Sequence, residues 1–217
     1  MGLFGQALYD HYHNCKPEAF FVCNEQEEHQ LDLHFYLTPK ADLLEEALLA
    51  HAAGRCLDIG CGAGRILRYL QAKSYTVVGM DIDPQLIQLC RELGDSPVHL
   101  ASWETMGQLG RFDTHMLLNR SIGMGGNLAG VKRLLAECAT SAASGGMLLF
   151  DSYEVSNPSG VIERTLRYKY RGQYSDTFPW IHFGSKIAER LLGETGWSCE
   201  TVVRDGERYG VVARKVS

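Results

Sequence analysis

The chain has 217 residues, of which 45% are hydrophobic and 22% charged, and its formal net charge is -5 at pH 7. These values fit a soluble globular chain with an ordinary core and exclude disordered or fibrous classes. A negative net charge disfavours nucleic-acid binding, since phosphate backbones attract basic surfaces. The sequence shows neither an apolar run of about 20 residues nor a secretory signal, so we expect a cytoplasmic protein without a membrane span.

Short apolar runs alternate with longer helical stretches from about Cys56 onward. This alternation indicates βαβ units and a parallel sheet, because strands buried on both faces are almost entirely apolar. The predicted strands are 55–59, 76–81, 98–101, 114–119 and 147–152. The predicted helices between them are 65–73, 84–93 and 128–143. The chain is predicted to end in a helix at 185–194 and a hairpin of strands 199–204 and 209–215, joined at Asp205-Gly206.

Residues 153–182 interrupt this alternation. Ile162, Leu166 and Tyr168 lie at even spacing opposite charged residues, which predicts an amphipathic strand. Its basic residues could bind an acidic substrate, although a solvated strand face is the simpler interpretation. These basic residues are Arg164, Arg167, Lys169 and Arg171.

A glycine-rich segment follows the first predicted strand. Asp58 precedes Gly60, Gly62 and Gly64, and a predicted helix begins at Arg65. Glycine adopts backbone angles that other residues avoid and lets the chain approach a ligand closely, while a helix N-terminus offers unpaired N–H groups. A dinucleotide-binding loop would need a small residue where Arg65 stands. The segment therefore predicts a loop for a different ligand.

Together with Gly79-Met80-Asp81, this loop resembles the signature of class I S-adenosylmethionine-dependent methyltransferases, and the resemblance covers roughly residues 40–217. It implies an α/β fold with a doubly wound, mostly parallel seven-stranded sheet that ends in a C-terminal antiparallel hairpin. It also implies a single domain. We expect a methyltransferase core at 41–217, with lid segments at 1–40 and about 153–182.

The resemblance implies S-adenosylmethionine as cofactor and suggests how it is bound. Asp58 would lie near the methionine amino group, Asp81 would accept hydrogen bonds from the ribose hydroxyls, and Ile82 would pack on the adenine. The family often has an acid after the third strand, where this chain departs with Ser102 and Trp103. Ser102 could hydrogen-bond and Trp103 could stack there, or Trp103 could belong to the core. The predicted cofactor residues are Tyr9, Asp58, Gly60, Cys61, Gly62, Gly64, Asp81, Ile82, Ser102, Trp103 and Asn119.

Methyl transfer from a sulfonium is an in-line displacement that needs alignment more than obligatory catalytic groups. In open α/β sheets the reacting centre lies beyond the carboxyl ends of the strands, which selects Asn119 and Tyr153. His182 is a candidate base, although a solvated loop histidine is the simpler interpretation. The catalytic residues are therefore left unassigned, with these three as candidates.

Cysteine and histidine spacing predicts neither disulfides nor a metal site. The cysteines are odd in number, with no CxxC pair, which suggests reduced thiols. The spacing of His11, His13 and His29 with Cys15 and Cys23 fits no standard zinc pattern.

We therefore predict a methyltransferase that acts on a small molecule, with no membrane partner and an oligomeric state left open. The motifs of enzymes that methylate planar amide or base nitrogens, or cytosine C5, are missing after the fourth predicted strand. The alternatives are an RNA or protein methyltransferase, or a non-catalytic protein that binds S-adenosylmethionine.

Overall fold

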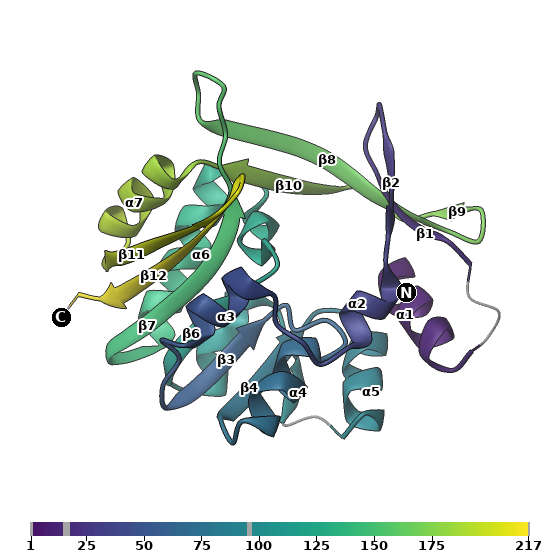
Figure 1. Cartoon of the computed structure of the whole chain (residues 1–217), viewed down its shortest axis with the longest axis horizontal. Helices are drawn as coiled ribbons and strands as arrows, with labels where there is room; N and C mark the ends of the chain where they lie inside the picture. The colour runs from purple at the N-terminus through teal and green to yellow at the C-terminus, as the bar shows by residue number, and fades with distance from the viewer. Residues whose placement is uncertain (1, 15–17, 95–96, 217) are drawn as a thin grey trace.

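A seven-stranded sheet forms the centre of the molecule (Figure 1). The computed structural model describes residues 2–14, 18–94 and 97–216. In spatial order the central strands are β11 (Trp197–Asp205), β12 (Arg208–Lys215), β7 (Ala142–Tyr153), β6 (Phe112–Leu117), β3 (Arg55–Ile59), β4 (Thr76–Asp81) and β5 (Val98–Leu100). The strands from β7 to β5 are parallel, while β12 runs antiparallel between β7 and β11. The predicted sheet and its terminal hairpin are therefore confirmed.

Helices cover both faces of this sheet. On one face lie α3 (Leu43–Leu49), α4 (Arg65–Ala72) and α5 (Pro84–Glu92), and on the other lie α6 (Leu128–Ser141) and α7 (Ser185–Glu194). Successive residues of β3 alternate between the two apolar clusters, with Cys56 on the α3 and α4 side and Leu57 on the α6 and α7 side. The parallel strands are mostly apolar because both of their faces are buried.

The predicted boundaries hold best where apolar runs end at turn residues. β3, β4 and α7 have the predicted bounds. However, β7 begins at Ala142, five residues before the predicted start, because Ala142 pairs with Phe112 of β6. The predicted helix 128–143 accordingly ends earlier, at Ser141, and β7 continues through Gly145 and Gly146, with Gly145 at a φ of 68°.

A second, smaller sheet lies beside the central one (Figure 1). It has the order β10-β8-β1-β2, with β9 paired to β8. Its strands are β1 (Phe20–Cys23), β2 (Glu28–Leu31), β8 (Val161–Tyr170), β9 (Gln173–Tyr174) and β10 (Phe178–Phe183). β1 pairs antiparallel with β8, so that Phe20 lies opposite Tyr170. Two segments far apart in the sequence thus build one sheet.

The N-terminal helices join the second sheet to the central fold. α1 (Leu3–Tyr12) and α2 (Leu33–Leu37) contribute Leu8 and Leu33 to an apolar cluster that also contains Leu89 of α5 and Tyr170 of β8. Two short 3-10 helices, η1 (Trp103–Leu109) and η2 (Ser121–Gly125), follow β5 and β6.

The described part of the chain has six free cysteines, and Cys15 lies outside the described residues. Within these ranges, we find no helix long and apolar enough to cross a membrane.

Candidate functional site

A cavity of about 1380 Å³ lies where the carboxyl ends of the central strands face the second sheet. It is lined on one side by the glycine loop after β3 and by the ends of β4 and β6, and on the other side by β8 and β10. The predicted cofactor residues that line it are Asp58, Gly60, Cys61, Gly62, Asp81, Ile82, Ser102, Trp103 and Asn119. The fold therefore brings residues from four strand ends to one cavity.

The glycine loop has the backbone conformation that its sequence predicts. Gly60, Gly62 and Gly64 have φ angles of 73°, 56° and 77°, in the left-handed region that favours glycine. The N–H groups of Gly60 and Cys61 both donate to the carbonyl of Met80 at 2.9 Å, which ties the loop to β4. A Cβ atom on Gly62 would meet nothing within 4 Å, so the loop borders open space on the cavity side.

Asp81 lies at the end of β4 and faces this loop. Its carboxylate accepts hydrogen bonds from the N–H groups of Gly62 at 2.9 Å and Asp83 at 3.0 Å. Burial raises the pKa of Asp81, and those two N–H groups oppose the shift. The next side chain, Ile82, lines the cavity and is 73% exposed, which is unusual for so apolar a residue. Asp83 caps α5 by accepting from the N–H of Gln85.

The remaining cofactor candidates fall into two groups. Ser102 and Trp103 line the cavity, and Ser102 also caps η1. Asp58 is only 4% exposed and lines the cavity as well. Gly64 instead ends the loop as the N-cap of α4. Tyr9 does not line the cavity in the described structure, because its ring packs against His13 at 4.2 Å between centroids.

Two aromatic residues that we did not single out in the sequence line the cavity in place of Tyr9. They are Phe4 of α1 and Tyr36 of α2, whose rings meet edge to face at 5.1 Å between centroids. Burial raises the pKa of the Tyr36 phenol. The aromatic richness of the first 40 residues was the only signal for them.

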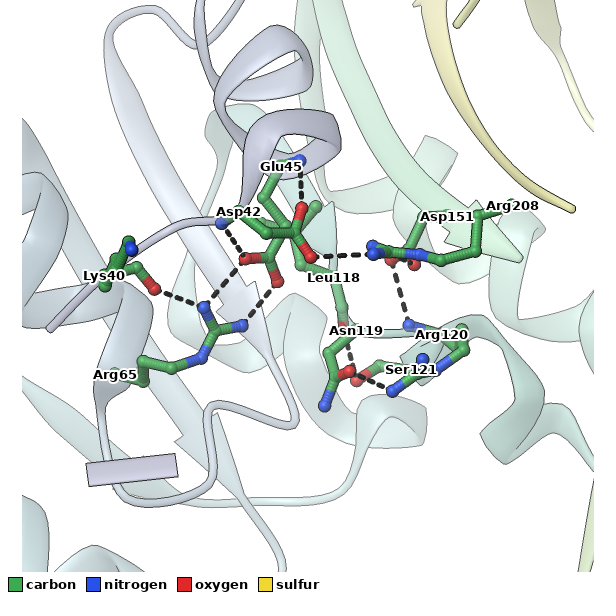
Figure 2. A network of polar contacts seen from close by, with 10 residues as sticks. All are labelled: Lys40, Asp42, Glu45, Arg65, Leu118, Asn119, Arg120, Ser121, Asp151 and Arg208. Atoms are coloured by element: carbon green, nitrogen blue, oxygen red, sulfur yellow. Dashed lines mark hydrogen bonds and ion pairs between the residues drawn. The ribbon is translucent and has the colours of Figure 1, made fainter. Parts of the chain in front are cut away.

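The backbone is strained where β6 reaches the cavity. Asn119 and Arg120 have φ angles of 54° and 64°, which cost roughly 1–3 kcal/mol each for residues other than glycine. The N–H of Arg120 donates to Asp151 at 2.9 Å and so holds this turn (Figure 2). The guanidinium of Arg120 donates to Asn119 and to the hydroxyl of Tyr153. Strain held in this way is typical of functional sites.

His182 and Tyr153 lie together at the side of the cavity near the second sheet. Their ring centroids are 5.3 Å apart, and both residues line the cavity. Nδ1 of His182 is buried and has no hydrogen-bond partner among the described residues. Burial and the positive charges of Arg164 and Arg120 lower the pKa of His182 to about 4, so the ring is neutral at pH 7. The structure thus brings the three catalytic candidates, His182, Tyr153 and Asn119, to one cavity.

Comparison with known proteins agrees with this geometry. Residues 57–150, which run from the glycine loop to β7, match the family model of a methyltransferase domain. This match and the fold support a class I S-adenosylmethionine-dependent methyltransferase. The same findings support S-adenosylmethionine as its cofactor. No curated protein matches the methyltransferase chain significantly in sequence.

Solved structures share the methyltransferase fold. A Bacteroides fragilis SAM-dependent methyltransferase in complex with S-adenosyl-L-homocysteine has a TM-score of 0.89 at 22% identity, over 99% of this chain and 94% of that chain. An amino pentose methyltransferase from Micromonospora echinaspora has a TM-score of 0.59 at 18% identity, over 79% and 88%. The Burkholderia thailandensis 1,6-didemethyltoxoflavin-N1-methyltransferase has a TM-score of 0.61 at 18% identity, over 79% and 76%.

Arg65, which excluded a dinucleotide loop in the sequence, has a structural role in this methyltransferase (Figure 2). Its guanidinium donates to both carboxylate oxygens of Glu45 and to the carbonyl of Lys40. It also stacks over the ring of Phe35 at 4.4 Å. The side chain of Glu45 is fully buried, and its carboxylate also accepts from the N–H of Asp42. This ion pair fixes the start of α4, and with it the end of the glycine loop, to α3.

Proposed function

We propose that this methyltransferase transfers the methyl group to a small-molecule acceptor. The observation that carries the proposal is the cavity of about 1380 Å³, which runs from the glycine loop to the second sheet. Small-molecule sites are concave and mostly apolar, with a few placed polar groups. This volume accommodates a cofactor and a metabolite-sized acceptor together. We propose the second sheet, from residues 1–40 and about 153–182, as the lid over that acceptor.

The residues around the glycine loop fit S-adenosylmethionine. The open space at Gly62 and the exposed Ile82 suit an adenosine that passes the loop closely and packs on an apolar side chain. The Asp81 carboxylate already accepts hydrogen bonds from the N–H groups of Gly62 and Asp83, and its remaining lone pairs would accept hydrogen bonds from the ribose hydroxyls. Asp58 would face the positively charged amino group. A carboxylate in each place complements a ligand that carries cationic groups and no phosphate.

The cofactor supplies a sulfonium-bound methyl group that is electrophilic. The chain's own residues align the acceptor and exclude water, and the second sheet serves both purposes. His182 lines the cavity with a neutral ring, and we assign it as the group that takes the proton of an acceptor O–H or N–H. The hydroxyl of Tyr153 accepts a hydrogen bond from Arg120, and the Tyr153 ring packs against the His182 ring and so orients it. Asn119 precedes Arg120 in the turn after β6 and also lines the cavity.

The structural neighbours include enzymes named for an amino pentose and for 1,6-didemethyltoxoflavin, both small molecules. This supports the proposal through fold alone. The stronger support is that residues of the second sheet line the cavity opposite the glycine loop, which leaves room for a small acceptor between them.

Calorimetry with S-adenosylhomocysteine tests the cofactor assignments. Loss of the charge-assisted hydrogen bonds in Asp81→Ala should weaken binding about a hundredfold or more. Asp205→Ala, at the exposed β11–β12 turn, is the matched control and should bind as the wild type does. Equal affinity of the wild type and Asp81→Ala would remove the ribose assignment.

A labelled-methyl assay tests the acceptor class. The protein is incubated with S-adenosylmethionine labelled in the methyl group and with separated metabolite, RNA and protein fractions. We expect label in the metabolite fraction. Label confined to RNA or protein would refute the small-molecule proposal.

A further inference from the structure

The cavity-facing side of β8 contains one unexpected cation. Alternate residues of a strand face the same side. Four alternate residues of β8 line the cavity: Ile162, Arg164, Leu166 and Tyr168. Arg164 therefore interrupts an otherwise apolar and aromatic row. Its guanidinium makes no hydrogen bond or ion pair with any other described residue of the chain, and the residue is exposed and lines the cavity.

The other basic residues of this segment are already engaged elsewhere. Lys169 forms an ion pair with Glu28 at 2.7 Å, and Arg171 forms one with Asp10 at 3.0 Å. Arg167 stacks on the ring of Tyr174 at 4.1 Å. The structure thus separates Arg164 from the basic strand face that the sequence suggested.

An aromatic wall lies next to Arg164. Trp180 of β10 is its direct cross-strand partner, and Phe178 lies opposite Leu166. Phe178 packs against Tyr168 at 4.8 Å between ring centroids. These rings line the cavity and provide flat apolar surfaces for a planar ligand body.

Two arginines line the cavity near His182. Arg120 lies on the opposite wall, and both Arg120 and Arg164 are near enough to act electrostatically on His182. Glu154 lines the same region, but it is bound by Arg204 and by the N–H and hydroxyl of Ser185. The other acidic residues here, Asp176 and Glu207, are exposed.

We propose that the acceptor carries an anionic group, a carboxylate or a phosphate, beside a planar apolar body, and that Arg164 binds the anionic group. A guanidinium that faces a largely apolar cavity without a partner suits a bidentate anion. The aromatic wall holds the planar body, and the anchor on β8 directs the opposite end of the acceptor toward His182. This inference rests on the proposed small-molecule acceptor.

Three probes that share one planar ring test the charge preference: benzoate, phenyl phosphate and neutral benzamide. Each is titrated to millimolar concentration against the protein saturated with S-adenosylhomocysteine, and binding is followed by ligand-observed NMR. At least one anion should bind about tenfold or more tightly than benzamide, the effect of one charge-assisted contact. The anion that binds better identifies carboxylate or phosphate as the recognised group.

Variants on the two faces of β8 test whether Arg164 causes the preference for an anionic probe. Arg164→Gln should abolish it, Arg164→Lys should keep part of it, and Arg167→Gln, on the outer face, should leave it unchanged. Equal binding of the three probes to the wild type, no binding of any, or a preference that survives Arg164→Gln would overturn the inference. Titration with S-adenosylhomocysteine separates this failure from failure of the proposed function, because Arg164→Gln leaves cofactor affinity unchanged.

Discussion

Replacing Glu45 with glutamine removes the negative charge that neutralises Arg65 in the interior. Glu45 has a side-chain exposure of 0% and Arg65 one of 7%, so the remaining guanidinium would stay buried. Removing one partner of a buried ion pair typically destabilises a protein by about 3–5 kcal/mol. We expect about 3 kcal/mol, at the lower end, because the Lys40 carbonyl and the Phe35 ring still contact the guanidinium.

Urea unfolding and thermal melting measure this loss. For a chain of this length, about 3 kcal/mol corresponds to a fall in Tm of about 6–12 °C. Glu46→Gln is the matched control, because Glu46 is an exposed neighbour on α3 that contacts the hydroxyl of Tyr69. That variant should stay within about 0.5 kcal/mol of the wild type.

A double-mutant cycle separates the ion pair from general damage to the core. Arg65→Met alone leaves the Glu45 carboxylate buried without its cation, so it should also destabilise the fold. In Glu45→Gln/Arg65→Met no unpaired charge remains, and the loss should be smaller than the sum of the single losses by about 2 kcal/mol. Additive losses, or equal stability of Glu45→Gln and Glu46→Gln, would refute the reasoning.

Two further predictions concern histidines whose pKa is lowered in the fold. Burial and the charge of Lys215 lower the pKa of His115 to about 4, against an ordinary value of 6.5. As pH falls from 6.5 to 4 the unfolded chain binds a proton that the native state does not, so His115 lowers stability by up to about 1.4 kcal/mol per pH unit. His115→Asn should flatten the pH dependence of the unfolding free energy in that window, and an unchanged slope would contradict the assignment. His182→Gln should lower kcat about a hundredfold for an acceptor that loses a proton, while calorimetry shows unchanged affinity for S-adenosylhomocysteine; an unchanged kcat would exclude His182 as the base.

The central sheet was predictable because its information is local. Runs such as Thr76–Asp81 are apolar between their first and last residues and are followed by turn residues, a composition typical of strands buried on both faces. The start of β7 was missed for the opposite reason. Ala142 is in a strand because β6 offers it a hydrogen-bonding partner, a tertiary effect that outweighs the loop preference of Gly145 and Gly146.

The glycine-loop side of the cavity was predictable for the same local reason. Gly60, Gly62 and Asp81 are separated by short, fixed distances along a strand, a loop and the next strand. The acceptor side depends on pairing between distant segments. Nothing in the sequence near Arg164 indicates that β10 will lie beside it, or that the cavity will face its even-numbered neighbours. Tyr9 was misplaced because packing of α1 against α5 and β8 decides which side of that helix faces inward.

The pairing of β1 with β8 makes the two peripheral segments mutually dependent. Four consecutive residue pairs join Phe20–Cys23 to 167–170, so each segment supplies the other with a hydrogen-bonding edge. A deletion or a one-residue slip in either strand would turn the inward row of the other toward solvent. With the second sheet as the proposed lid, substitutions on the inner row, such as those at Arg164 and Trp180, would change the cavity without disturbing this pairing.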